Sequence, residues 1–198
     1  ETIIVDPAYA VSELMDIAKQ DDMNVVGALA THYHADHVGG SMMGFNIEGA
    51  STLLQLADIP IHVQTDEAPW IQRTTGVATD SLVLHQSGDK VAVGEIEINL
   101  LHTPGHTPGS QCFLVENMLI AGDTLFLEGC GRTDLPGSNP EQMFESLQLL
   151  SKLDDDVIVY PGHQYSIPKS MSMGEVRTTN YVFKPKTKDG WMQWFGGA

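Results

Sequence analysis

Three histidines and one aspartate lie within six residues, directly after an apolar segment that is typical of a buried strand. The apolar segment runs from Val25 to Ala30, and the polar residues are His32, His34, Asp36 and His37. Imidazole and carboxylate groups together are ligands that zinc, iron and manganese accept. Their spacing is not the i, i+4 spacing of a helical zinc site. We therefore interpret the cluster as a loop that wraps around metal ions at the end of a strand.

Three more candidate ligands follow predicted strands in the same way. Loops at strand ends, with Gly and Pro nearby, are places where a rigid sheet can present metal ligands. Such positions are occupied by His106 in Thr103–Gly109, by Asp123 after Met118–Ala121, and by His163 after Val157–Tyr160. With the first cluster they make seven candidate ligands, enough for two ions that share one bridging carboxylate.

Short strands and helices alternate along the chain. Residue patterns predict strands at Ile3–Val5, Val25–Ala30, Ile61–Val63, Met118–Ala121 and Val157–Tyr160, and antiparallel sheet over Ser81–Val115 with a turn or bulge at Gly94. Helices are predicted from the apolar spacing of Val11, Leu14, Met15 and Ala18, over Gly49–Ala57, and near Trp191 and Trp194. The mixture predicts one layered α/β domain over residues 1–198.

A further helix start is marked by Asn139-Pro140-Glu141, with Asn as the N-cap and Pro at the first helical position. The buried stripe of this helix is expected to be Met143, Phe144, Leu147, Leu150 and Leu153.

The charge balance limits the classes of partner. Twenty-six acidic residues against ten basic ones give a formal net charge of −16. Nucleic acid and anionic membrane surfaces are both disfavoured, because each needs a basic footprint. No run approaches the roughly 18 apolar residues of a membrane span, and two cysteines make no disulfide framework. We expect a cytoplasmic protein that acts on a small-molecule substrate.

The order of the motifs resembles that of the metallo-β-lactamase superfamily. His-x-His-x-Asp-His is followed by Gly-His-Thr-Pro-Gly, Gly-Asp-Thr and Pro-Gly-His, and the resemblance covers about residues 3–180. Gly129–Asp134, Gly-Cys-Gly-Arg-Thr-Asp, is most similar to the glyoxalase II and persulfide dioxygenase branch. The resemblance implies a four-layer αβ/βα sandwich. Because relatives usually begin with one or two more strands, the first strand or strands are expected to be missing here.

The resemblance also implies how the ligands divide between two divalent metal ions. The first ion would be held by His32, His34 and His106, the second by Asp36, His37 and His163, with Asp123 bridging both. Zinc is the first expectation, and iron or manganese also suit these ligands. A carboxylate at Asp123 argues against the zinc β-lactamases, which usually have Cys or Ser there.

The implied activity is metal-assisted hydrolysis of an acyl compound such as a thioester. An alternative is a persulfide dioxygenase with a single iron on His32, His106 and Asp123. The superfamily also contains lactonases and β-lactamase-like hydrolases, and a non-catalytic sensor that keeps the metals is a third class.

Three residues have candidate roles in catalysis or substrate binding. Asp36 would both bind its ion and orient the attacking water. Arg132 is a candidate clamp for a substrate carboxylate, or else forms an ion pair with Asp134. Tyr165 resembles the Tyr of Gly-His-x-Tyr in glyoxalase II, which helps to hold the substrate, and the alternative is a surface Tyr.

Several remaining polar and sulfur-containing residues are assigned to packing. His62, His85 and His102 are expected to be spectators, with support of a ligand as the alternative for His102. Cys112 is expected in the core and Cys130 in a loop beside the site, without a nucleophilic role. Asp6 could support a ligand, although a turn or helix start is its commoner use.

Overall fold

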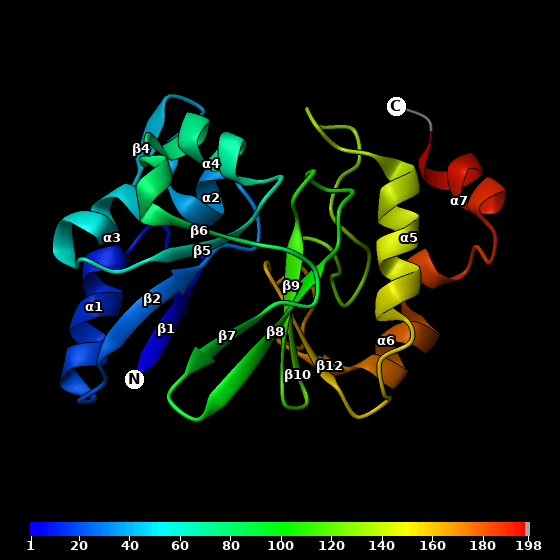
Figure 1. Cartoon of the computed structure of the whole chain (residues 1–198). Coiled ribbons are helices and arrows are strands. Elements are labelled where there is room, and N and C mark those ends of the chain that lie inside the picture. The colour runs from blue at the N-terminus through cyan, green and yellow to red at the C-terminus, as the bar shows by residue number, and fades with distance from the viewer. Residues whose placement is uncertain (197–198) are drawn as a thin grey trace. The chain divides into compact units, whose positions relative to one another are not determined.

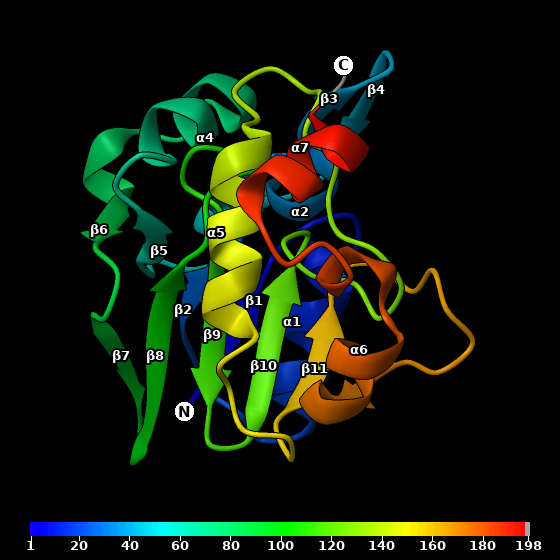
Figure 2. The same ribbon diagram turned by 90° about the vertical axis from the view of Figure 1, so that its right-hand side faces the viewer.

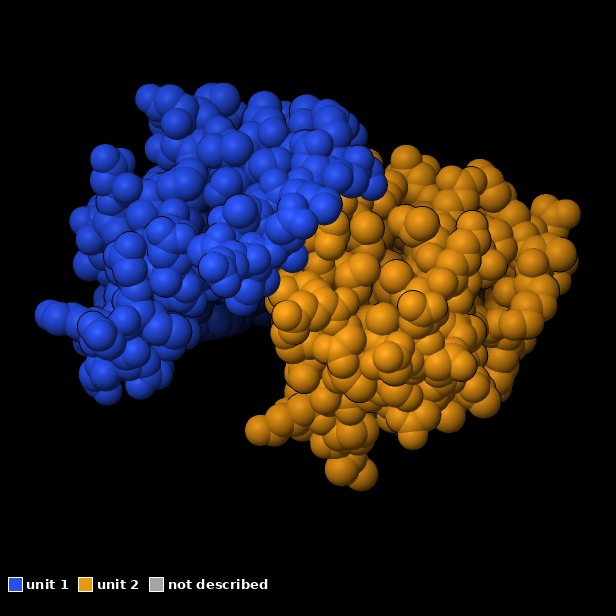
Figure 3. Space-filling view, turned by 60° about the horizontal axis from the view of Figure 1, so that its bottom comes forward, with its two compact units in different colours: residues 1–97 blue, residues 98–198 orange. Residues whose placement is uncertain are grey.

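The structure is a computed structural model that describes residues 1–196, and its chain forms two units divided between residues 97 and 98 (Figure 3). Each unit combines strands with helices (Figure 1), so the predicted mixed α/β architecture is confirmed. The prediction of a single domain over residues 1–198 stays a prediction. Among the described residues, no helix is both long enough and apolar enough to cross a membrane.

The first unit is built on a parallel sheet with the strand order β1-β2-β5-β6. Its strands are β1 (Thr2–Val5), β2 (Val25–Leu29), β5 (Ile61–Gln64) and β6 (Leu82–His85). Parallel neighbours need crossover connections, and helices supply them here. These helices are α1 (Val11–Gln20), α3 (Ala50–Leu56) and α4 (Ala68–Thr75), with a 3-10 turn at Thr79–Ser81. Their apolar faces share one core with the inner faces of β2 and β5.

The direction of β6 corrects the sequence analysis, which placed Ser81–Val115 in antiparallel sheet. Leu82 pairs with Ile61 in a parallel ladder between β6 and β5. Alternating residues identify a strand but not its direction, and direction depends on the connection. Helix α4 makes the crossover that a parallel pair requires, and the sequence analysis did not predict α4.

A short helix and a hairpin separate β2 from α3. They are α2 (Ala35–Val38), β3 (Gly40–Met42) and β4 (Phe45–Ile47). The base of the hairpin is closed where Gly39, at φ +81°, lies against the backbone of Gly49. A side chain at either glycine would collide with the other, so this crossing needs two glycines.

The second sheet has the strand order β12-β11-β10-β9-β8-β7. Among the strand pairs whose register the structure describes, β10–β11 is parallel, whereas β8–β9, β9–β10 and β11–β12 are antiparallel. The predicted turn at Gly94 is confirmed, because this glycine has a positive φ. The strands are β7 (Lys90–Val93), β8 (Ile96–His102), β9 (Gln111–Val115), β10 (Met118–Gly122), β11 (Ile158–Pro161) and β12 (Met171–Ser172).

Helix α5 (Pro140–Leu150) crosses one face of this sheet, as Figure 2 shows. The predicted N-cap is confirmed, since Asn139 Oδ1 accepts hydrogen bonds from the backbone N–H groups of Glu141 and Gln142. Four of the five predicted stripe residues lie within the helix and are buried, and Leu153 lies beyond its end. The chain continues through α6 (Met173–Thr179), a 3-10 turn (Tyr181–Phe183) and α7 (Lys188–Phe195).

Helix α7 is attached to the unit by Trp191. Its side chain is fully buried, its ring stacks on Phe195 at 4.0 Å between centroids, and Phe144 of α5 lies at 6.0 Å. The indole Nε1 donates a 2.8 Å hydrogen bond to the carbonyl of Pro140. The other predicted tryptophan, Trp194, is 59% exposed.

We expect Trp191→Ala to lower the free energy of unfolding by about 3–5 kcal/mol, because it leaves a large cavity and an unpaired carbonyl. Trp194→Ala is the matched control and should change it by less than about 0.5 kcal/mol. Urea denaturation of both variants measures the difference. Equal effects of the two substitutions would contradict the role given to Trp191.

Candidate metal centre

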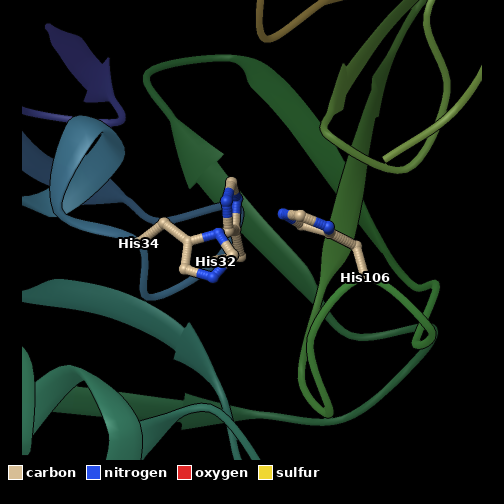
Figure 4. A group of neighbouring side chains, drawn as sticks. All are labelled: His32, His34 and His106. Atoms are coloured by element: carbon tan, nitrogen blue, oxygen red, sulfur yellow. The ribbon is translucent and has the colours of Figure 1, made fainter. Parts of the chain in front are cut away.

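Four of the predicted ligands follow β2 in the first unit. His32 and His34 lie on the loop, whereas Asp36 and His37 lie on α2, where the sequence analysis expected only a loop. His32 and His34 stand edge to face with ring centroids 4.8 Å apart (Figure 4), and the His37 ring lies 4.0 Å from that of His32. Asp36 Oδ2 is 4.0 Å from His37 Nε2. The rings of His32 and His37 are buried. His34, Asp36 and His37 follow His32 by two, four and five residues, and their side chains meet because α2 begins directly after His34.

Asp6, at the end of β1, holds this loop. Its Oδ1 accepts from the backbone N–H of Thr31 at 2.7 Å, and its Oδ2 accepts from Thr31 Oγ1 at 2.7 Å. Oδ2 also lies 2.8 Å from Nδ1 of His37. Strands β1 and β2 are parallel, so their carboxyl ends meet at one edge of the sheet and Asp6 reaches the loop. Of the two roles weighed for Asp6, the structure shows the contact with a predicted ligand, His37.

These contacts fix the proton positions on two imidazoles. The Thr31 hydroxyl has one hydrogen, which it donates to Asp6, so it accepts from His32 Nδ1 at 3.0 Å. His37 Nδ1 likewise donates to the Asp6 carboxylate. Both rings then have their lone pair on Nε2, the atom that a metal would bind. Thr31 was not singled out from the sequence, although it directly precedes the cluster.

The second unit gathers the other three predicted ligands. Asp123 Oδ2 lies 3.4 Å from His163 Nε2 and 3.7 Å from His106 Nε2. The register explains this meeting, since β10 and β11 are parallel and Gly162 N donates to Gly122 O at 2.8 Å. Strand β8 runs in the same direction as β10, because both are antiparallel to β9. All three ligands thus follow strands that end at the same sheet edge.

The His106 loop is fixed from two sides. Ser138 Oγ donates to the carbonyl of His106 at 2.7 Å, just ahead of α5. His106 Nδ1 donates to the carbonyl of Arg132 at 2.9 Å, which again leaves the lone pair on Nε2. The loop that contains Arg132 can approach His106 only with a glycine at position 131. A Cβ there would collide with the Asp123 carbonyl and lie 2.8 Å from the His106 ring. The Gly-Cys-Gly-Arg motif therefore supports a ligand through its backbone.

The donor chemistry of both sets fits divalent metal ions. Imidazole Nε2 atoms and carboxylates suit zinc, iron or manganese, and the Nδ1–H groups are held by a carboxylate, a hydroxyl or a carbonyl, as in metal-binding histidines. Two atoms bound to one tetrahedral zinc lie about 3.3–3.4 Å apart, because each bond is about 2.0–2.1 Å. The spacings around Asp123 are close to that value.

Comparison with known families gives a match to the family described as "Metallo-beta-lactamase superfamily" over residues 1–163. The chain belongs to the metallo-beta-lactamase superfamily. The match covers the whole first unit and the second unit as far as His163, the last of the seven predicted ligands.

Relatives within the superfamily include named hydrolases. The chain is 31% identical over 188 residues to the "Probable polyketide biosynthesis zinc-dependent hydrolase BaeB" of Bacillus velezensis, covering 94% of this chain and 78% of that protein. It is 30% identical to a hydroxyacylglutathione hydrolase of Xanthomonas campestris, covering 94% and 66% of the two chains. The crystal structure of ETHE1 from Myxococcus xanthus has a TM-score of 0.81 at 26% identity and covers 98% and 79%. The predicted superfamily and its fold are thus confirmed.

The two residues predicted to bind the substrate lie in the second unit. Arg132 forms a bidentate ion pair with Asp134, with N···O distances of 2.8 and 2.7 Å, and its side chain is 66% exposed. This pair holds the pKa of Asp134 below its usual range. Tyr165 is 68% exposed and stacks on His163, with ring centroids 5.2 Å apart. Their binding of a substrate stays a prediction.

The two cysteine thiols are poor candidates for a catalytic nucleophile. Burial raises the pKa of Cys112 to about 11 and that of Cys130 to about 12. Cys112 is buried in the core, as expected, and Cys130 packs against that core. A thiol with such a pKa is protonated at neutral pH.

The histidines assigned to packing have structural contacts. His102 Nε2 donates to the carbonyl of Pro108 at 2.9 Å. His62 Nδ1 and His85 Nε2 lie 2.9 Å apart across β5 and β6. Burial, and secondly the charge of His85, lowers the pKa of His62 from 6.5 to about 4.

This shift predicts how stability depends on pH. An unfolded histidine binds a proton near pH 6.5, whereas folded His62 does so only near pH 4, so acid favours the unfolded chain between these values. The metal-free protein should lose stability as pH falls from 6.5 to 4, and His62→Gln should lose less. Urea denaturation at several pH values measures both slopes. Parallel curves for the two proteins would contradict the assignment.

Proposed function

We propose that this chain is a metal-dependent hydrolase that cleaves an acyl compound such as a thioester. The observation that carries the proposal is the state of the ligand histidines. His32, His37 and His106 each use Nδ1 to donate to a neighbouring group, which leaves Nε2 for a metal. Relatives named as a zinc-dependent hydrolase and a hydroxyacylglutathione hydrolase support the reaction class.

The ligands of both units are proposed to hold two divalent ions, with zinc as the first candidate. The division follows the family pattern: His32, His34 and His106 for one ion, Asp36, His37 and His163 for the other, and Asp123 for both. When bound, two such ions lower the pKa of a water molecule towards about 7 and polarise a substrate carbonyl. Asp36 is proposed to orient that water while it binds its own ion.

The chain's own residues determine which nucleophile is available. Burial keeps the thiols of both cysteines, Cys112 and Cys130, protonated at neutral pH. Hydrolysis by water therefore needs no covalent intermediate on a side chain. This argument favours direct hydrolysis over acyl transfer through a cysteine.

Substrate recognition is proposed for Arg132 and Tyr165. The pair with Asp134 uses two of the five N–H donors of Arg132, so further donors can bind a substrate carboxylate. Tyr165 presents an exposed ring beside His163. Such a ring can cover an apolar part of a substrate that reaches the ligands.

A second candidate function is oxidation of a persulfide with a single iron on His32, His106 and Asp123. Two histidines and one carboxylate are the ligand set of many non-haem iron oxygenases. The similarity to ETHE1 suits this candidate as well as the first.

Assays with and without oxygen separate the two candidates. We expect thioester cleavage by the zinc-loaded protein to continue without oxygen, because hydrolysis needs only water and a Lewis acid. Glutathione persulfide should not be consumed by the zinc form, since zinc has no redox chemistry. Oxygen-dependent persulfide turnover by the iron form, without thioesterase activity of the zinc form, would refute the hydrolase.

A substitution at Asp123 tests the proposed bridge. Asp123→Ala should lower both the metal content and the hydrolysis rate, because a bridging carboxylate contributes to both ions. Asp156→Ala, at an exposed residue after α5, is the matched control and should keep both. Elemental analysis of the purified proteins measures metal per chain. Two ions and full activity in Asp123→Ala would show that the residue does not bridge.

A further inference from the structure

A second carboxylate, besides that of Asp6, contacts the ligand loop. Glu67 directly precedes α4 and is 1% exposed. Its Oε1 accepts a 2.6 Å hydrogen bond from the backbone N–H of Tyr33. Because Tyr33 stands between His32 and His34, this peptide N–H belongs to the segment that joins the two imidazoles.

An aromatic contact ties the same segment to α4. Trp70, one turn after Glu67, stacks on the Tyr33 ring with 4.9 Å between centroids and 23° between planes. The Tyr33 ring in turn meets the His34 ring at 4.6 Å. The guanidinium of Arg73 lies 5.0 Å from the centroid of the Trp70 ring. A continuous column of side chains thus runs from α4 to His34.

Helix capping does not account for the Glu67 side chain. The backbone carbonyl of Glu67 accepts from the N–H groups of Trp70 and Ile71, so the main chain begins the helix. The side chain makes no capping hydrogen bond. Its carboxylate is instead used on Tyr33, where a charge-assisted bond offsets part of the cost of burying the group.

We propose that Glu67 and Trp70 are a positioning pair that orients His32 and His34 for metal binding. The inference rests on the proposed metal role of these two histidines. Asp6 holds the loop at Thr31 and His37, on either side of this segment. Glu67 holds its middle, at Tyr33, and Trp70 limits the rotation of the Tyr33 ring against His34. Groups that orient ligands in this way typically change metal affinity ten- to a hundredfold when removed.

Zinc affinity, measured by competition with a chromophoric chelator, tests the pair without any substrate. Glu67→Ala should bind zinc roughly ten- to a hundredfold more weakly than the wild type. Glu67→Gln should stay within about threefold, because its amide oxygen can still accept from the Tyr33 N–H. Asp66→Ala, at the exposed neighbouring residue, is the matched control and should bind like the wild type.

Substitutions at Trp70 keep the test decisive if Glu67→Ala does not fold. Trp70→Phe retains a ring against Tyr33 and should bind zinc like the wild type. Trp70→Leu loses the aromatic stack and should bind roughly two- to tenfold more weakly. The melting temperature of each metal-free variant separates a loss of affinity from a loss of stability.

The outcomes distinguish this inference from the proposed function. Unchanged zinc affinity in Glu67→Ala would overturn the positioning pair but not the proposed function. If Glu67→Ala does not fold, unchanged zinc affinity in Trp70→Leu would do the same. A Glu67→Gln protein as weak as Glu67→Ala would also overturn it. If the variants show the expected zinc affinities but the wild type does not hydrolyse thioesters, the proposed hydrolase function is wrong and the positioning pair is still supported. Absence of zinc binding in the wild type would overturn both.

Discussion

The carboxylate of Asp6 is the interaction on which the order of the ligand loop depends. One side chain accepts from a peptide N–H, a hydroxyl and an imidazole, and so connects the loop's first residue to its last ligand. The position is demanding, because Asp6 has φ +51°, in the left-handed region. Three hydrogen bonds, each stabilised by the charge of the acceptor, offset the cost of that conformation. The backbone N–H of Asp6 also donates to the carbonyl of Leu29, and this bond fixes Asp6 relative to the end of β2.

The second unit uses a backbone carbonyl and a side-chain hydroxyl for the same purpose. His106 is oriented by the Arg132 carbonyl, and its loop is held by Ser138 and by the start of α5. Asp123 and His163 need no connecting residue, because they follow two neighbouring strands that pair in parallel. In both units the ligands leave the sheet at strand ends, where backbone hydrogen bonding fixes their starting points. Side-chain hydrogen bonds then hold the loop backbone and set the rotation of the rings.

Local signals in the sequence predicted the parts that depend on neighbours in the chain. The strand before each ligand, the Asn139 cap and the burial of Cys112 all follow from alternation or capping, and the structure confirms them. Helix α4 was missed because only Ala68 and Ile71 among its residues are buried, too few for an apolar period. Without α4, the direction of β6 could not be inferred.

The supporting residues of the site were harder to predict because their partners are distant in sequence. Thr31 is adjacent to its cluster, but Glu67 is 34 residues from Tyr33 and has no local pattern that marks it. The sequence pointed to the Arg132 side chain as a clamp for a substrate carboxylate, whereas the structure shows that the Arg132 carbonyl accepts a hydrogen bond from His106. A motif therefore identified which residues carry donor atoms, while the orientation of those atoms depends on contacts that only the folded chain supplies. The sequence identifies the predicted ligands, whereas the orientation of their side chains depends on the fold. Substitutions at Glu67 and Trp70 are therefore expected to change zinc affinity while every predicted ligand stays in place.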